Sequence, residues 1–207
     1  MDIKFQFEKL DKNKNIVSVS PKYQSKSFVE NFLKLLFMDM IVGGLNIYGI
    51  DGVYRGMGAS LRCVVNMGGE DFHRVSALAD DWNRLAVSDV GIIIGSGTEP
   101  ILITDYQLQT KIHNGNEAGE LEYLPCSGTN FTVNTGTDVA SFEIIRIFRN
   151  NTGDPITINE MGISQIGSYS GYSYYTPALI IRDLVDPGQT VDDGEYLKAK
   201  YTIQIAA

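Results

Sequence analysis

Cysteine and histidine are scarce in this chain of 207 residues, which has two of each. Cys63 and Cys126 form no Cys-x-x-Cys pair and have no paired histidine beside them, so they predict buried thiols in preference to one disulfide. A Ser-His-Asp triad or a histidine metal site would have to use His73 or His113. The composition therefore excludes a disulfide-rich scaffold and leaves little material for histidine chemistry.

Long apolar runs are missing as well. Every apolar run stops short of the ~18 residues that a membrane-spanning helix needs. The first ten residues mix charged side chains with Phe5 and Phe7 and lack the apolar centre of a signal peptide. The sequence therefore predicts no membrane association.

Basic residues are outnumbered, because 17 Lys and Arg stand against 25 Asp and Glu and give a net charge of −8. The imbalance is uneven along the chain. Residues 1–40 hold seven lysines and five acids, whereas residues 41–207 hold ten basic and twenty acidic residues. Because phosphate contacts need clustered Lys and Arg, the sequence predicts no nucleic-acid partner.

Short alternating segments, separated by turn residues and rich in glycine, fill most of the sequence. The clearest covers residues 195–205, in which apolar Leu197 and Tyr201 alternate with polar Lys198 and Thr202, as in a strand with one wet face. Further strands are predicted at 3–8, 16–19, 92–94, 101–104, 121–124, 130–134, 140–149, 156–164 and 179–185. Many short strands at this spacing predict a mainly β fold, an antiparallel β-sandwich of jelly-roll kind.

One helix is expected near the N-terminus. Ser27 and Glu30 have the spacing of a capping box, in which the Ser27 side chain accepts a hydrogen bond from the Glu30 amide. The apolar residues that follow predict a helix over 27–40, which the glycine pair 43–44 ends.

The apolar positions of this helix cover more than one face. It is therefore either an ordinary core helix or a helix buried against another subunit, with Phe28, Phe32 and Leu36 as the expected interface contacts. After the helix the sequence changes to short strand segments separated by glycine-containing turns. This change predicts an N-terminal strand or arm plus helix over residues 1–44 and a β-sandwich domain over residues 45–207.

Two features near the C-terminus have simple interpretations. Residues 186–188 read Asp-Pro-Gly and predict a turn between strands. Arg182 and Asp183 are expected to be surface charges, or alternatively a pair that spans a subunit contact.

The candidate catalytic features are weak. The glycine stretches at 52–58 and 95–97 match neither GxGxxG nor GxxxxGK[ST], so they are expected to form turns and not phosphate sites. Glu70, Asp71 and His73 lie close together, which suits either a polar loop or, as a remote option, a hydrolase.

The acidic pairs at 80–81 and 192–193 suit acid/base chemistry or calcium, but they lack the spacing of an EF-hand. The sequence accordingly predicts no catalytic residue, no metal site and no cofactor.

A tyrosine-rich segment at 167–177 is the best candidate for a contact surface. Tyr169, Tyr172, Tyr174 and Tyr175 alternate with Ser and Gly, the combination that serves adaptable binding loops. These tyrosines either contact a neighbouring subunit or a glycan, or they pack back on their own sheet.

The part of the chain from Ile92 onward resembles a recurring β domain of tailed-bacteriophage virion proteins, found in head-associated, tail-fibre and baseplate-type components. The resemblance rests on a pattern of turns and strands: Ile94-Gly95-Ser96-Gly97-Thr98, Thr104-Asp105-Tyr106-Gln107-Leu108, Phe148-Arg149-Asn150-Asn151-Thr152-Gly153, Ile158-Asn159-Glu160-Met161-Gly162, Leu179-Ile180-Ile181-Arg182-Asp183, and Gly194-Glu195 leading to Tyr201-Thr202-Ile203.

This resemblance implies a non-enzymatic structural subunit that forms homo-oligomers on a virion and contacts other virion proteins. It supplies no catalytic residues, and residues 1–91 match its pattern less well. The alternative from another class is a carbohydrate- or receptor-binding module that contacts host surface glycans through the tyrosine-rich segment.

Overall fold

The computed structural model describes residues 2–25, 27–34, 45–48, 50, 52, 54–57, 89–128, 131–168 and 175–206. Antiparallel β-strands make up most of this part of the chain, and the only described helix covers residues 30–34. The expectation of a mainly β, antiparallel fold is confirmed. No described helix has the length and the apolar character needed to cross a membrane.

The larger sheet, sheet A, contains eight strands. β2, β1, β13, β10 and β7 follow one another across it, while β3 pairs with β1, and β8 and β9 pair with further stretches of β10. The bounds are β1 Asp2–Leu10, β2 Ile16–Val19, β3 Tyr23–Ser25, β7 Glu122–Tyr123, β8 Ser127–Gly128, β9 Thr132–Asn134, β10 Val139–Arg149 and β13 Tyr196–Ala206.

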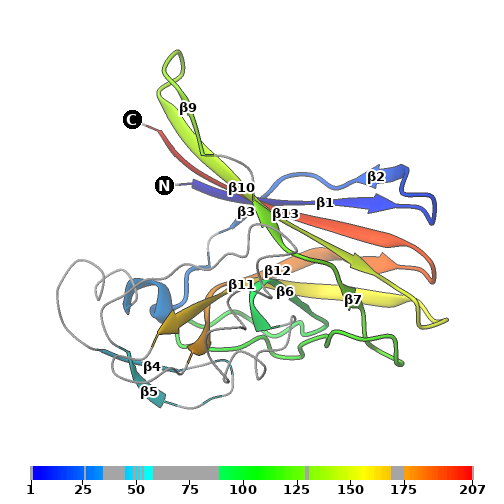
Figure 1. The fold of residues 1–207 in the computed structure, drawn as a ribbon, viewed down its shortest axis with the longest axis horizontal. Coiled ribbons are helices and arrows are strands. Elements are labelled where there is room, and N and C mark those ends of the chain that lie inside the picture. Colours follow the sequence, from blue (N-terminus) through cyan, green and yellow to red (C-terminus); the bar gives the residue numbers. More distant parts are fainter. Residues whose placement is uncertain are drawn as a thin grey trace, which may run out of the picture.

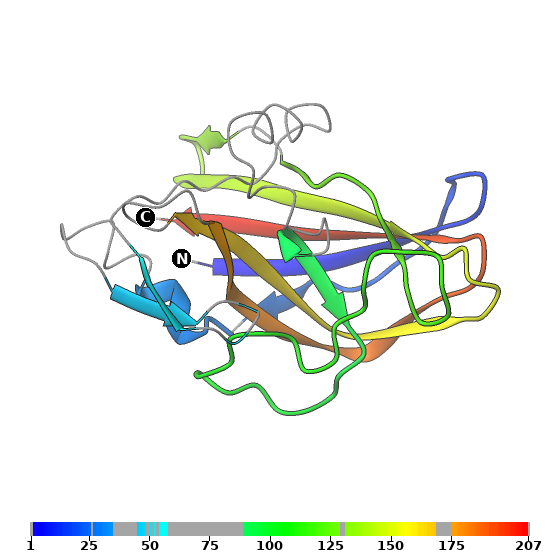
Figure 2. The same cartoon turned by 60° about the horizontal axis from the view of Figure 1, so that its bottom comes forward.

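The smaller sheet, sheet B, contains three strands in the order β12-β11-β6. The bounds are β6 Gly91–Gly95, β11 Ile156–Ser168 and β12 Tyr175–Val191. Sheet A lies above sheet B in Figure 1, and the two sheets form a sandwich-like arrangement that Figure 2 shows from another side. β4 (Leu45–Tyr48) and β5 (Tyr54–Met57) form a separate antiparallel pair.

The main hydrophobic core lies between the two sheets. Alternate residues of β1 are buried, so Phe5 and Phe7 point inward from sheet A. Ile92 of β6 and Met161 of β11 belong to the same cluster from the side of sheet B. Because one apolar cluster is built from both sheets, burial of these side chains holds the sheets together. The jelly-roll strand order stays a prediction.

The N-terminal strand is part of the sandwich. β1 lies between β2 and β13 and pairs with β13 along its whole length, from Asp2 opposite Gln204 to Leu10 opposite Tyr196. The alternation predicted for the last strand is confirmed, since Leu197 and Tyr201 are buried in β13. A domain boundary at residue 44 stays a prediction, but the strands before it, β1 to β3, belong to sheet A.

The predicted capping box is wrong. The Glu30 amide donates a hydrogen bond to the Ile103 carbonyl, and the helix begins at residue 30. Ser27 and Phe28 instead run along the edge of β12, where the Arg182 amide donates to the Ser27 carbonyl. The Glu30 amide, which the cap would have used, is thus bonded to Ile103, while the backbone of Ser27 pairs with β12. Residues 35–44, where the helix was expected to continue, lie outside the described residues.

Two other local predictions are wrong. Residues 101–104 form turns and not a strand, and their backbone is held by the carboxylate of Asp105, which accepts a hydrogen bond from the Leu102 amide. Residues 186–188 are no turn between strands. They lie within β12, where residues 185–188 stand between Leu184 and Gln189 against the single residue Asn159 of β11 and form a long bulge. The chain turns after β12, at residues 192–195.

Candidate functional site

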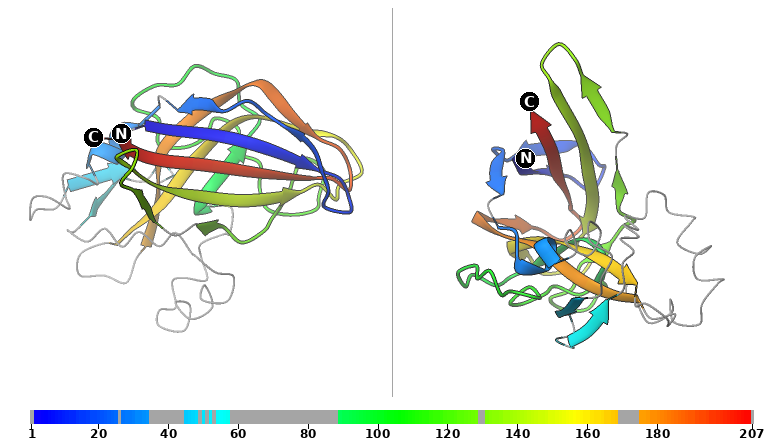
Figure 3. Two further views of the ribbon diagram at one scale, coloured as in Figure 1. Left: turned by 90° about the horizontal axis from the view of Figure 1, so that it is seen from above. Right: turned by 90° about the vertical axis from the view of Figure 1, so that its left-hand side faces the viewer.

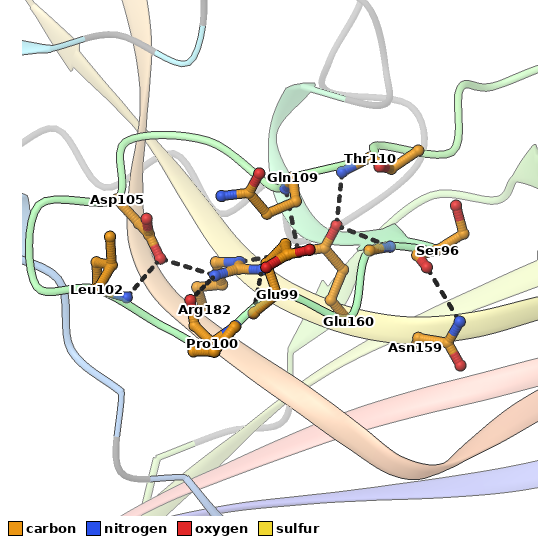
Figure 4. Close-up of polar contacts among 11 residues, drawn as sticks. Ser96, Glu99, Pro100, Leu102, Asp105, Gln109, Thr110, Asn159, Glu160 and Arg182 are labelled. Carbon is orange, nitrogen blue, oxygen red and sulfur yellow. Dashed lines mark hydrogen bonds and ion pairs between the residues drawn. The ribbon is translucent and has the colours of Figure 1, made fainter.

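A buried arginine lies at the centre of the polar network shown in Figure 4. Arg182 of β12 is 0% exposed, so its expected place on the surface or at a subunit contact is wrong. Its Nε donates to Oε2 of Glu160 at 2.8 Å, and its Nη1 donates to Oδ2 of Asp105 at 2.8 Å. A buried guanidinium is tolerated only when such partners replace water, so this network is required for the local fold.

The same guanidinium also holds the chain that covers it. Nη2 of Arg182 donates to the Glu99 carbonyl at 3.0 Å, and Nη1 donates to the Pro100 carbonyl at 3.3 Å. These contacts join β12 to the connection that follows β6, across more than eighty residues of sequence. Arg182 therefore fixes the path of residues 99–105 over the outer face of sheet B.

Glu160 of β11 is the second anchor, and it is also 0% exposed. Its Oε1 accepts hydrogen bonds from the amides of Gly97 at 3.2 Å and Thr110 at 2.8 Å. Its Oε2 accepts from the Gln109 amide at 3.1 Å and from Arg182. One carboxylate thus satisfies three backbone amides of the covering segment and one arginine donor (Figure 4).

Glycine is required where the chain approaches this carboxylate. A Cβ atom on Gly95 would lie 2.6 Å from Oε1 of Glu160, and one on Gly97 would lie 2.5 Å from the same atom. The predicted turn at 95–97 is wrong, because Gly95 ends β6 and residues 96–97 begin an irregular connection, whose glycines allow the backbone to surround an anion. That anion is the carboxylate of Glu160 in the same chain.

A second buried arginine fixes the start of the same segment. Arg146 of β10 donates from Nη1 to the carbonyls of Val90 at 2.6 Å and Ile92 at 2.9 Å, and from Nε to the Leu124 carbonyl at 3.0 Å. Burial lowers the pKa of Arg146. Its guanidinium lies over the ring of Tyr123, 5.3 Å from the centroid. Sheet A and β6 are joined by these contacts.

Further buried polar groups join the layers. The hydroxyl of Tyr123 donates to the Ile112 carbonyl at 2.6 Å, and burial raises the pKa of Tyr123 far above its ordinary value. Asp183, which was expected on the surface, is buried and accepts a hydrogen bond from the Tyr201 hydroxyl of sheet A at 3.0 Å. Cys126 is a buried free thiol, as predicted, whereas Cys63 lies outside the described residues.

The outer side of this fixed segment carries a pocket of about 360 Å³. Residues 107–113 run beside β6, because the Ser96 amide donates to the Thr110 carbonyl and the Ile112 amide donates to the Ile94 carbonyl. Every second side chain of this stretch lines the pocket, and Asp89 completes the polar wall. The polar lining is Asp89, Gln107, Gln109, Lys111 and His113.

Charge in the pocket is balanced by one ion pair. Nζ of Lys111 contacts Oδ1 of Asp89, and both side chains are mostly buried in the pocket wall. Ile50, Ile93 and Leu108 supply the apolar part of the lining. Ile93 and Leu108 belong to a small hydrophobic cluster on the outer face of sheet B, separate from the main core. The pocket thus combines a polar rim with an apolar floor.

A different surface lies where sheet A extends beyond sheet B. Val133 of β9, Ala140 of β10 and Ile205 of β13 are cross-strand neighbours, and Val133 and Ile205 are 63% and 53% exposed. The next inward residues of the same face, Phe142 and Ile203, pack against the main core. Figure 3 shows the β9–β10 hairpin and the end of β13 rising away from β11 and β12. The core-facing side of sheet A is therefore partly uncovered.

Several predicted contact residues have a described position. Phe28 packs against the main core, and its ring lies 4.1 Å from the ring of Phe32, centroid to centroid. Phe28 therefore makes contacts within the chain. Leu36, Tyr169, Tyr172 and Tyr174 lie outside the described residues, and Tyr175 is the first residue of β12.

Most of the candidate acidic and histidine residues fall in a part of the chain that the structure does not describe. Glu70, Asp71, His73 and the pair at 80–81 lie outside the described residues. Asp192 pairs with Lys9, and Asp193 accepts from the Gly153 amide, so both help to hold their turn. Within the described residues there is no group of three or more His, Cys, Asp or Glu side chains placed to hold a metal ion.

The sequence held one signal that the charges of this network are buried, although it held none for the contacts that they make. Arg182 lies within the apolar run 179–185, and Glu160 lies within the alternating strand 156–164. Opposite charges inside two apolar strands indicate a buried pair, because each charge needs a partner when its strand is covered on both faces. No comparable signal in the sequence indicated the pocket, since its polar residues have the pattern of an ordinary solvent-exposed segment.

Comparison with known proteins gives this chain no family, because no family model, no curated protein and no solved structure matches it.

Proposed function

We propose that this chain is a structural subunit of a tailed-bacteriophage virion, associated with the capsid or with the tail and its appendages. It acts through symmetric self-assembly and contacts with other virion proteins, and not through catalysis. The resemblance of residues 92–207 to virion β domains supports the proposal. So does the surface of the sandwich itself, which offers apolar area suited to association.

The observation that carries the proposal is the uncovered face of sheet A, made up of Val133, Ala140 and Ile205, together with the exposed side chain of Phe131 immediately before β9. Phe131 is 64% exposed, and the face continues the apolar side that sheet B covers elsewhere. Contiguous exposed apolar area on a folded protein marks an interaction surface. A flat apolar sheet face suits a second copy of the same chain, because two such faces pack as the sheets of a sandwich do.

Sedimentation equilibrium of the purified chain tests the assembly part of this proposal. The wild type should form oligomers, and Phe131→Ser combined with Val133→Ser should shift the population towards monomer. The matched control changes Ile16 and Val17 of β2 to Ser, since both are exposed apolar residues on the opposite edge of sheet A. A wild type that stays monomeric at high protein concentration contradicts assembly through this face.

Gold labelling tests the virion part. Antibody to the recombinant chain should label intact or opened phage particles that carry its gene, and the position of the label separates head from tail. Particles that carry no label in either state contradict a virion role, whatever the oligomeric state in solution.

A further inference from the structure

The pocket beside β6 is lined by polar and apolar side chains that the proposed assembly role does not use. We propose that it binds one neutral sugar ring, as the terminal unit of a glycan. The inference goes beyond the proposed assembly role and does not depend on it, because the pocket lies on the outer face of sheet B and the uncovered apolar face belongs to sheet A.

The polar rim matches the hydrogen-bonding needs of hydroxyl groups. Each sugar hydroxyl both donates and accepts, so a site that binds several of them needs both kinds of partner close together. The amides of Gln107 and Gln109 supply both, Asp89 supplies an acceptor and Lys111 supplies donors. His113 at the rim supplies one donor and one acceptor in its neutral form.

The balance of charge favours a neutral ligand. Lys111 is paired with Asp89, so neither presents an uncompensated charge to the pocket. A phosphate or carboxylate ligand would have to compete with Asp89 for the ammonium group, and a cationic ligand would have to compete with Lys111 for the carboxylate. A polyhydroxylated neutral ligand can bond to both members of the pair without separating them.

The floor and the volume fit one ring. Ile50, which is partly buried and packs on the buried side chains of Ile93 and Leu108, supplies apolar surface for the C–H face of a pyranose, while the hydroxyls at the edge of the ring reach the rim. The volume of about 360 Å³ is near the lower end of the range of roughly 300–1,000 Å³ that ligand pockets occupy. The ligand is therefore a single sugar unit, and not a long oligosaccharide buried along its length.

The buried network keeps the binding side chains in place. The carboxylate of Glu160 holds the amides of Gln109 and Thr110 from inside, while the side chain of Gln109 points into the pocket. On the other wall, Arg146 holds the carbonyls of Val90 and Ile92 beside Asp89. A pocket whose backbone is already fixed loses little entropy when a ligand binds.

Saturation-transfer NMR with methyl pyranosides tests this inference directly. The purified full-length chain is mixed at millimolar concentrations with the methyl glycosides of glucose, galactose, mannose and N-acetylglucosamine, and inorganic phosphate is titrated separately. At least one pyranoside should receive saturation, with a millimolar dissociation constant, and phosphate should not displace it. No transfer to any pyranoside, or displacement by phosphate at equal concentration, overturns the inference.

Two variants locate the site. Gln107→Ala and His113→Ala shorten exposed rim side chains and should each weaken binding about tenfold or more, which corresponds to roughly 1.4 kcal/mol. The control Lys12→Ala changes an exposed residue outside the pocket and should bind as the wild type does. Unchanged circular dichroism confirms that the variants fold. Binding that survives both rim changes places the sugar elsewhere and refutes this pocket as the site.

Discussion

Glu160→Gln is the most direct test of the buried network, because it keeps the shape of the side chain and removes its charge. The wild-type carboxylate accepts four hydrogen bonds within the chain, two on each oxygen. Gln has one oxygen and one NH₂ group. Either orientation of the amide therefore places a donor against two other donors, and at least two of the four bonds are lost.

The magnitude follows from burial. Hydrogen bonds to charged groups contribute about 1.5–3 kcal/mol each, and Arg182 also loses one of its two carboxylate partners while staying fully buried. Breaking one side of a buried ion pair costs about 3–5 kcal/mol. We expect the free energy of unfolding to fall by about that amount, a large part of the roughly 5–15 kcal/mol that stabilises a typical domain.

Urea denaturation and amide hydrogen exchange together measure this change. The urea midpoint should fall by roughly 1–2 M, and the amides of Gly97, Gln109 and Thr110 should exchange faster. The control is Glu122→Gln, which changes a half-exposed carboxylate paired with Arg149 at 3.7 Å and should cost less than about 1 kcal/mol. If Glu160→Gln proves as mild as its control, or leaves those three amides as protected as before, the reasoning about the network fails.

Three further predictions concern other groups of the fold. Gly97→Ala should lower stability by about 1–3 kcal/mol in denaturant titrations, since its Cβ would contact a buried carboxylate. Gly136→Ala should be nearly neutral, because its Cβ would meet only Oδ1 of Asn134, at an ordinary contact distance of 3.4 Å. Burial, and then the neighbouring carboxylate of Asp183, raises the pKa of Tyr201 well above 10.0. Because the unfolded chain then loses this proton at a lower pH than the folded chain does, the free energy of unfolding should decline as the pH rises above 10. Tyr201→Phe should make this decline with pH less steep. Hydrogen bonds from Asn15, mainly from its backbone amide and also from its side chain, lower the pKa of Asp11 below 3.8. Asn15→Pro removes both donors, so an NMR titration of this variant should show the pKa of Asp11 return towards 3.8.

The strands of this protein could be predicted from sequence because alternation is a local signal. β13 and β1 bury every second residue, and this pattern depends only on the two-residue period of an extended chain. The same local reasoning failed at residues 186–188. An Asp-Pro-Gly sequence suits a turn, yet here the partner strand β11 continues past it, and the extra residues form a bulge.

The candidate sites depended on contacts that no local pattern contains. Arg182 looked like a surface charge because the segment that covers it, residues 99–105, lies about eighty residues earlier in the chain. Glu30 looked like the end of a capping box because nothing nearby indicates that Ile103 accepts its amide hydrogen. The polar side of 107–113 became a pocket only when β6 and Asp89 were placed beside it.

The pairing of β1 with β13 has a consequence for the order of folding. These strands come from opposite ends of the chain, and Asp2 even accepts a hydrogen bond from Gln204. During synthesis, β1 is made long before β13, the strand that pairs with it along its whole length. The strands β6, β11 and β12 can pair with one another before β13 is made. Sheet B is therefore expected to form first and to serve as the template on which sheet A closes. Pairing between strands so far apart in the sequence is slow. Until β13 pairs with β1, Phe5 and Phe7 remain exposed and can aggregate or bind a chaperone.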